Sequence, residues 1–169
     1  MGGLIAVRTV LDAATDYQTL ILTGPLLGVP TQPPSWQTWL LRTLSALFPA
    51  VKALEIDASA VSRDQTVVDD YVADPLVHHE NIPARTVVSL FDEASAVLGR
   101  ASEISLPTLL LHGEEDVLTS VPASRQFMAD LSATDKHITV YPGMYHELFN
   151  EPEREDIIRT CLDWIATRL

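Results

Sequence analysis

Asp116 and His146 are the two residues whose types and placement could support a chemical reaction. Each lies in a short polar loop just after an apolar run. A carboxylate that accepts a hydrogen bond from an imidazole N–H fixes the tautomer of the ring, which leaves the other nitrogen free to take a proton from a nucleophile. The pair therefore indicates general-base catalysis. A second interpretation stays open on spacing alone, in which Asp116 is a turn residue and His146 is a hydrogen-bonded loop residue.

The elements that must position this pair are predicted to be strands. Short apolar runs bounded by turn residues occur at 19–23, 106–112 and 137–141, and such runs are typical of buried strands. A helix is predicted at 121–131, between the last two strands. Alternating strands and helices predict a parallel sheet covered by helices. Because functional loops gather at the carboxyl ends of parallel strands, we expect the two polar loops to meet.

Helices are predicted at both ends of the chain. Residues 1–7 are small and apolar, as in the first turns of a buried helix. Residues 152–169 keep helical spacing, and we expect Asn150 or Glu151 to cap this helix, with Pro152 in its first position.

Residues 25–105 interrupt the alternation. Apolar side chains recur at helical spacing from Trp36 to Leu47, and further helices are predicted at 67–71 and 86–98. This pattern indicates a mostly helical insertion between two strands of one sheet.

Five groups of residues occur in the order in which one known family has them. They are Met1-Gly2-Gly3, Leu22-Thr23-Gly24-Pro25, Ser62-Arg63-Asp64 with Asp74-Pro75-Leu76, His112-Gly113 with Asp116, and Tyr141-Pro142-Gly143 with Tyr145-His146-Glu147. Through these groups the chain resembles the monoacylglycerol lipase and lysophospholipase branch of the α/β-hydrolases, nearly from end to end.

The resemblance implies an α/β fold class, the C-terminal part of an α/β-hydrolase fold. Its parallel sheet would be covered by helices and would carry a helical cap insertion. Residues 1–24 and 106–169 would form the core, incomplete because its N-terminal strands are absent, and residues 25–105 would form the cap or lid. The apolar stripe of the first cap helix would face an acyl chain or a membrane surface, or else pack against its own protein, and both alternatives stay open.

The resemblance also implies roles for individual residues. Asp116 and His146 match the acid and the base of a Ser-Asp-His triad, and Leu26 and Leu118 match positions that line an acyl channel. The family's nucleophile stands in Gly-x-Ser-Met-Gly-Gly, so it would directly precede Met1, whose backbone N–H matches an oxyanion-hole donor. We therefore expect the chain alone to lack the nucleophile and to be inactive.

No serine within the chain has the sequence context expected of that nucleophile. None stands in a Gly-x-Ser-x-Gly elbow, and the serines nearest the two loops have the expected roles of turn and cap residues. They are Ser105, Ser120, Ser124 and Ser132.

The function implied by the resemblance is that of a serine carboxylester hydrolase that cleaves lipid monoesters such as monoacylglycerols or lysophospholipids. No metal and no organic cofactor is expected. Two alternatives remain: a non-catalytic lipid-binding or interaction module, and a hydrolase with an Asp nucleophile, similar to epoxide hydrolases.

Composition narrows the partners. A net charge of −12 would repel phosphate backbones, so nucleic acid is not an expected partner. The expected partners are a small lipid ester and, through the cap, a membrane surface.

Asp74, His78 and His79 do not complete a metal site, because no further ligand accompanies them. His112 is expected to make a local hydrogen bond, and Cys161 to be a core residue. With no stretch long enough to span a bilayer and no signal-peptide pattern, we expect a cytoplasmic location.

Overall fold

Three parallel strands form the sheet of the computed structural model, which describes residues 1–13, 16–31 and 33–168. They are β1 (Leu20–Thr23), β4 (Thr108–Gly113) and β5 (Lys136–Tyr141), in the spatial order β1-β4-β5. The three predicted strands are confirmed, each within two residues of its expected bounds. Since β4 and β5 are neighbours, the loops that follow them lie side by side.

Strand β4 is the centre of the sheet, and all six of its residues are buried. Leu110 belongs to the apolar cluster on one face, whereas Leu109 and Leu111 belong to the cluster on the other face. A strand covered on both faces has a continuous apolar sequence instead of an alternating one, which explains the run of three leucines. Burial of each such side chain contributes about 1.5–3 kcal/mol.

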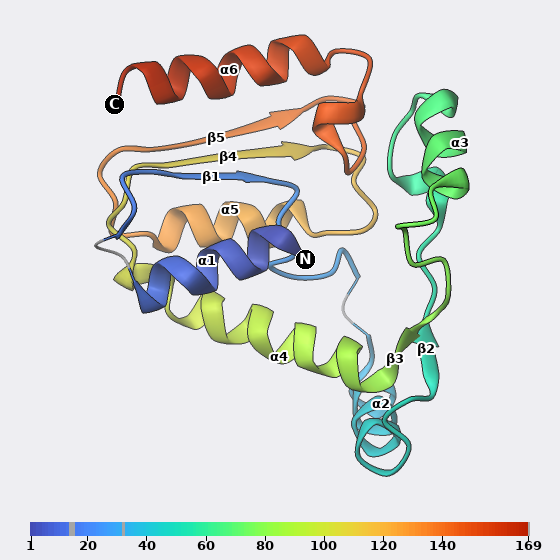
Figure 1. The fold of residues 1–169 in the computed structure, drawn as a ribbon. Helices are drawn as coiled ribbons and strands as arrows, with labels where there is room; N and C mark the ends of the chain where they lie inside the picture. Colours follow the sequence, from blue (N-terminus) through green and yellow to red (C-terminus); the bar gives the residue numbers. More distant parts are fainter. Residues whose placement is uncertain (14–15, 32, 169) are drawn as a thin grey trace.

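Helices cover both faces of the sheet (Figure 1). Helices α1 (Gly2–Asp12), α4 (Ala84–Gly99) and α5 (Val121–Asp130) lie on one face, and α6 (Arg154–Ala166) lies on the other. The apolar start of the chain does form a helix, as predicted. It buries one face only, because Leu4 and Val7 are in the core while Ile5 is exposed.

The start of α6 differs from the prediction. The helix begins at Arg154, and Glu153 occupies the cap position without a side-chain hydrogen bond. Asn150 closes a short 3₁₀ turn, η4 (Leu148–Asn150), and the side chain of Glu151 is buried against other partners, so neither residue caps α6. In place of a side-chain cap, the acidic side chains in the first turn of α6 stabilise the start of the helix through the helix dipole. Residue 169, the last of the predicted helix, lies outside the described residues.

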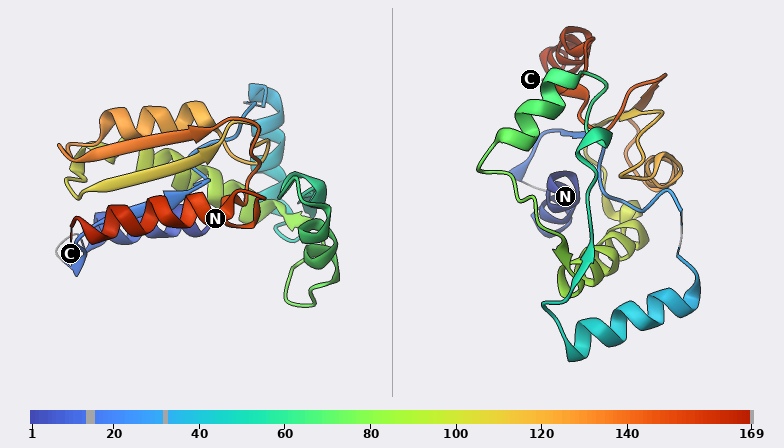
Figure 2. Two further views of the ribbon diagram at one scale, coloured as in Figure 1. Left: turned by 90° about the horizontal axis from the view of Figure 1, so that it is seen from above. Right: turned by 90° about the vertical axis from the view of Figure 1, so that its right-hand side faces the viewer.

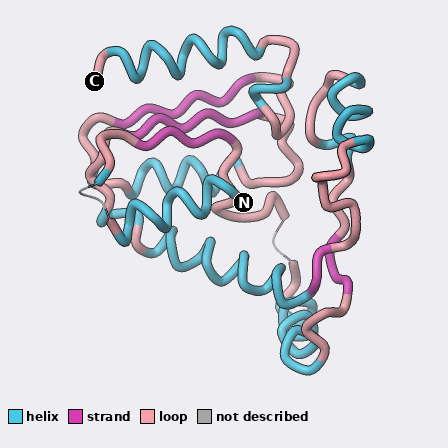
Figure 3. Tube along the Cα trace, in the orientation of Figure 1, coloured by secondary structure: helices cyan, strands magenta, loops and turns pink. Residues whose placement is uncertain are grey.

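The insertion forms a separate arm at the carboxyl ends of the strands (Figures 1 and 2). It contains α2 (Ser35–Leu47) and α3 (Gln65–Ala73), which were predicted as helices, and the short 3₁₀ turn η2 (Ala58–Ala60), which was not predicted. Two short antiparallel strands that were not predicted, β2 (Lys52–Leu54) and β3 (Ile82–Pro83), join the arm to α4 (Figure 3). They carry too few residues to leave an alternating pattern in the sequence.

Helix α4 falls within residues 25–105 but packs into the core. Its buried Ala94 and Val97 belong to the same cluster as Leu4 and Val7 of α1. The short 3₁₀ turn η3 (Ala101–Glu103) then leads to β4. The division into a core of 1–24 and 106–169 and a cap of 25–105 stays a prediction.

None of the helices within residues 1–13, 16–31 and 33–168 has the length and apolarity that crossing a membrane requires.

Candidate active site

The structure brings Asp116 and His146 together. Nδ1 of His146 lies 2.8 Å from Oδ2 of Asp116, because the loops after β4 and β5 meet at one edge of the sheet. The side chain of Asp116 is fully buried, whereas that of His146 is 23% exposed. The acid is thus shielded from water, while the imidazole can still be reached from outside. This is the arrangement that a general base needs.

Five donors surround the carboxylate of Asp116. Its Oδ1 accepts hydrogen bonds from the backbone N–H groups of Leu118 (2.8 Å) and Thr119 (2.9 Å). Its Oδ2 accepts from the hydroxyl of Thr119 at 2.7 Å, in addition to His146. The fifth donor is a second imidazole, that of His112, whose Nε2 lies 3.1 Å from the same Oδ2 and 3.1 Å from the hydroxyl oxygen of Thr119.

The surroundings of His112 assign its protonation. The ring is fully buried, and its Nε2 faces a carboxylate, so this nitrogen must carry the hydrogen. Its Nδ1 then accepts a hydrogen bond from the hydroxyl of Ser124, 3.0 Å away. The local hydrogen bond expected for His112 is confirmed. Its engagement with the acid itself was missed, because nothing in the sequence shows that the ring turns back toward Asp116.

These contacts keep Asp116 ionised. Burial acts to raise the pKa of the carboxyl group, but the hydrogen bonds from His112 and His146 outweigh burial and hold the pKa well below its ordinary value of 3.8. A carboxylate that stays charged can stabilise an imidazolium beside it.

Two glycines allow the loops to approach closely. A Cβ on Gly113 would lie 2.1 Å from the backbone oxygen of Tyr145. Gly24 has φ +47°, and a Cβ there would lie 3.1 Å from Nδ1 of His146. A larger residue at either position would push the base away from the acid.

Gly24 and Pro25 connect three parts of the site. Gly24 follows β1 and touches His146, and its carbonyl oxygen lies 3.4 Å from the hydroxyl of Thr119 in the acid loop. Pro25, the residue after Gly24, lies against the start of α1, since a Cβ on Gly3 would lie 2.8 Å from Cβ of Pro25. The start of α1 is therefore packed against the turn that touches the base.

Met1 occupies the cap position of α1, and the residue is 62% exposed. Its carbonyl oxygen accepts the first hydrogen bonds of the helix, from Leu4 and Ile5. Its position at the start of α1 is the one that the oxyanion-hole prediction requires, and the role itself stays a prediction.

The predicted channel residues Leu26 and Leu118 lie on neighbouring loops. The N–H of Ser120 donates to the oxygen of Gly28 at 3.1 Å, which joins the two loops. Leu26 is half-buried and packs against the core, and Leu118 is half-buried and uses its backbone N–H to hold Asp116. Their role in acyl binding stays a prediction.

The loop that carries His146 is anchored from the insertion. Glu151 is fully buried, and its Oε1 accepts hydrogen bonds from the backbone N–H of Tyr145 (3.2 Å) and of Arg63 (3.1 Å). The guanidinium of Arg63 pairs with Oε2 of the same carboxylate, which raises the pKa of Arg63. Sequence reasoning noted Ser62-Arg63-Asp64 as a motif but did not find its partner.

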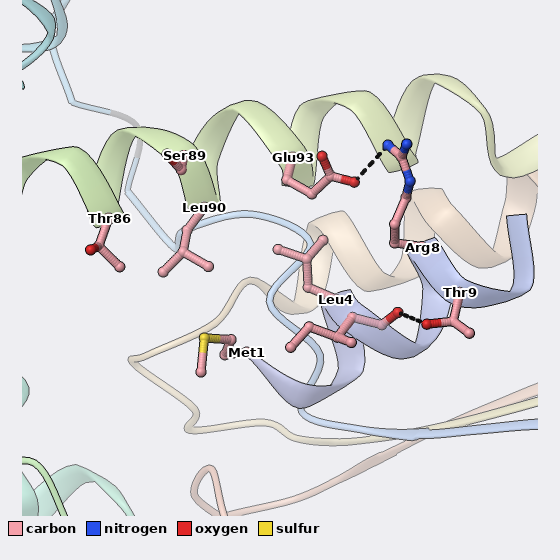
Figure 4. A pocket seen from close by; sticks show the side chains of 9 residues that line it. Met1, Leu4, Arg8, Thr9, Thr86, Ser89, Leu90 and Glu93 are labelled. Carbon is pink, nitrogen blue, oxygen red and sulfur yellow. Dashed lines mark hydrogen bonds and ion pairs between the residues drawn. The ribbon is translucent and has the colours of Figure 1, made fainter. Parts of the chain in front are cut away.

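A separate hollow of about 400 Å³ lies between α1 and α4 (Figure 4). It is lined mainly by apolar side chains, including Met1, Leu4 and Leu90, and the ion pair of Arg8 with Glu93 (3.0 Å) lies at its edge. Asp116 and His146 do not line it. The hollow therefore does not contain the acid and base.

Three serines near the loops make side-chain hydrogen bonds, and of these Ser120 has the predicted role of a cap residue. Ser120 caps α5, Ser124 is buried against His112, and the hydroxyl of Ser132 donates to the oxygen of Ile104. Within the described part of the chain, His, Cys, Asp and Glu side chains do not form a group of three that could hold a metal ion.

Known proteins resemble the chain closely in sequence. The serine aminopeptidase S33 family, Hydrolase_4, matches residues 1–153. The chain is 34% identical to the monoacylglycerol lipase of Mycolicibacterium smegmatis, over all of this chain and 60% of that protein. It is 28% identical to the human monoglyceride lipase, over 99% of this chain and 56% of that protein.

Solved structures agree with these sequence matches. The monoacylglycerol lipase of Paleococcus ferrophilus superposes with a TM-score of 0.88 at 29% identity, over 99% of this chain and 65% of that one. A soluble variant of the Saccharomyces cerevisiae monoglyceride lipase, in complex with a substrate analogue, superposes with a TM-score of 0.83 at 17% identity, over 98% and 59% of the two chains. The chain spans less than two thirds of each of these relatives.

Proposed function

Because this chain belongs to the serine aminopeptidase S33 family and is an α/β-hydrolase of the monoacylglycerol lipase branch, we propose that it supplies the acid and base of a serine ester hydrolase. The proposed substrates are lipid monoesters, the substrate class that the names of the relatives indicate. One observation carries the proposal. The buried, ionised Asp116 holds His146 at 2.8 Å, and the Gly24-Pro25 turn connects this pair to the start of α1.

The nucleophile in this proposal is a serine joined directly before Met1. The start of α1 contacts Pro25 through Gly3, and the adjacent Gly24 contacts His146. A serine at the head of α1 would therefore stand on the side of the site where the base is. The elbow between a strand and a helix is also where this class of enzymes exposes its serine.

The proposed reaction uses His146 as the base and Asp116 as the acid that orients it. His146 donates its Nδ1–H to Asp116, so its Nε2 is free to take the proton of the serine hydroxyl while the serine oxygen bonds to the ester carbonyl carbon. The imidazolium next gives this proton to the leaving alcohol as the ester C–O bond breaks. Water, deprotonated by His146, then bonds to the acyl carbon, and the bond from this carbon to the serine oxygen breaks as the imidazolium returns the proton to that oxygen, which releases the fatty acid.

The test uses a longer protein in which upstream residues place Gly-x-Ser in frame before Met1, hereafter the extended protein. Sequencing the DNA upstream of the Met1 codon is expected to reveal this elbow. The extended protein is expected to hydrolyse monoacylglycerol, and the 169-residue chain, which has no Gly-x-Ser-x-Gly elbow, is expected to be inactive. An aspartate in place of the serine, or a 169-residue chain that is more active than its His146→Ala variant, would contradict the proposal.

We further propose that α2 contacts a lipid surface. Trp36, Trp39 and Leu47 are 64%, 68% and 67% exposed, so packing against the chain itself does not account for the stripe at these positions. Exposed tryptophans are favoured at membrane interfaces. The insertion that carries them lies at the end of the sheet where the candidate acid and base lie (Figure 1).

Vesicles of neutral phospholipid test this contact, since a net charge of −12 disfavours anionic ones. We expect a blue shift of tryptophan fluorescence and co-sedimentation with vesicles, both reduced in a Trp36→Ser/Trp39→Ser variant. Trp164, which is 8% exposed and packed in the core, should not respond. Equal sedimentation of the variant and the unmodified chain would argue against the contact.

A further inference from the structure

Residues Val61 to Arg63, in the insertion, are bonded to the loop that follows β5. The oxygen of Val61 accepts the N–H of Glu147 at 2.8 Å, and the hydroxyl of Ser62 donates to the oxygen of Asn150 at 3.0 Å. Arg63 adds its backbone N–H and its guanidinium, both directed at Glu151. A short segment of the insertion thus contacts the base loop along much of its length.

Glu151 is the centre of this contact. A buried carboxylate is costly unless it is paired and fully hydrogen-bonded, and Glu151 meets both conditions. Its Oε1 accepts hydrogen bonds from the backbone N–H groups of Tyr145 and Arg63, while its Oε2 pairs with the guanidinium of Arg63. Arg63 also pairs with Glu153 on its exposed side. A contact that only attached the insertion to the rest of the chain would not need a fully buried carboxylate.

The bonds to this segment fall on both sides of the base. The N–H of Tyr145, just before His146, is held by Glu151, and the N–H of Glu147, just after it, is held by Val61. The imidazole itself is held by Asp116. Backbone fixed on both sides limits the positions that the ring can reach, and small displacements of a catalytic group have large effects on rate.

We propose that Glu151 and Arg63 are positioning residues for His146, through which the insertion sets the place of the base. The inference rests on the proposed function for its effect on catalysis, but its structural part can be measured in the 169-residue chain alone. According to this inference, the essential group is the oxygen of Glu151 that accepts the hydrogen bond from the backbone N–H of Tyr145.

The experiment compares two variants by NMR. Arg63→Met/Glu151→Leu replaces the pair with apolar groups of similar volume, a change that often leaves stability unaffected, and it removes the acceptor for Tyr145. We expect this variant to melt cooperatively but to lose the resonance of the hydrogen-bonded Nδ1 proton of His146, with faster exchange of the Tyr145 amide. Glu151→Gln keeps an acceptor oxygen and is expected to keep the resonance. Glu153→Ala, which removes only the exposed partner of Arg63, is the matched control and should behave as the unmodified chain.

In the extended protein, the double variant is expected to lower kcat about 100-fold with little change in KM, since substrate contacts are not altered. A folded double variant that retains the His146 resonance would overturn the inference, as would a folded Glu151→Gln variant that loses it. If the resonance responds as expected while the extended protein has no esterase activity, the positioning role stands and the proposed function fails.

Discussion

The loops that carry the candidate acid and the candidate base are held in contrasting ways. Apart from His146 itself, the groups that contact the carboxylate of Asp116 come from its own stretch of chain, namely Leu118, Thr119 and the ring of His112. The backbone around His146 is fixed by Val61 and by the pair of Arg63 with Glu151, which joins residues 88 positions apart. The carboxylate of Asp116 is thus contacted mainly by nearby residues, whereas the backbone around His146 is also held by residues of the insertion.

This contrast has a functional consequence. A carboxylate held mainly by nearby donors keeps its geometry when more distant parts of the molecule move, because most of those donors lie within four residues of it. A base held from the insertion shifts with the insertion. We infer that changes in the acid loop alter the chemistry of the site directly, whereas changes in the insertion alter the position of His146.

The largest effect is expected from Asp116→Asn in the extended protein. An amide in place of the carboxylate favours the wrong tautomer of His146, and kcat should fall about 10⁴-fold. The assay is monoacylglycerol hydrolysis, with Asp130→Asn on the surface of α5 as the matched control. A loss of less than 10-fold would show that Asp116 does not orient the base.

A smaller effect is expected from His112→Leu, which removes a donor from the acid without touching His146. Loss of this hydrogen bond should raise the pKa of Asp116 toward its ordinary value of 3.8. Because the pKa of Asp116 is depressed in the folded state, its contribution to stability is complete above pH 3.8 and is lost as the pH falls toward the folded-state pKa. The variant should therefore begin acid unfolding at a higher pH than the unmodified chain.

Urea unfolding as a function of pH measures this effect in the 169-residue chain. At neutral pH the variant should lose about 1–3 kcal/mol, because the hydroxyl of Ser124 is left without its partner. His112→Gln is the matched control, since its amide can donate at nearly the same place. Identical acid unfolding in the unmodified chain and in both variants would show that His112 does not lower the pKa of Asp116.

The same contrast explains what could be predicted from the sequence. The three strands of the parallel sheet, most of the helices, and Asp116 and His146 with their meeting at one edge of the sheet all follow from local apolar runs and from the rule for parallel strands. The family resemblance then added the expected roles of Met1, Leu26 and Leu118, which the structure places but does not test. Ser120 was also recognised as a turn or cap residue, because its partner lies three residues away.

What could not be predicted depends on long-range contacts. Nothing near Glu151 shows that its side chain turns to Arg63, so it was expected as a helix cap, and α6 begins two residues later than predicted. The direction of the His112 ring, toward Asp116 and not merely along its own strand end, is likewise set by packing. The exposure of Trp36 and Leu47 depends on where the arm stands relative to the core.

The most direct test of the central claim is labelling of the extended protein by a fluorophosphonate probe, which reacts with a serine only when a base activates it. The account predicts rapid labelling of the serine before Met1, and its loss in His146→Ala but not in His137→Ala, which alters an exposed histidine of β5. Labelling that persists in a folded His146→Ala variant would contradict the assignment of His146 as the base.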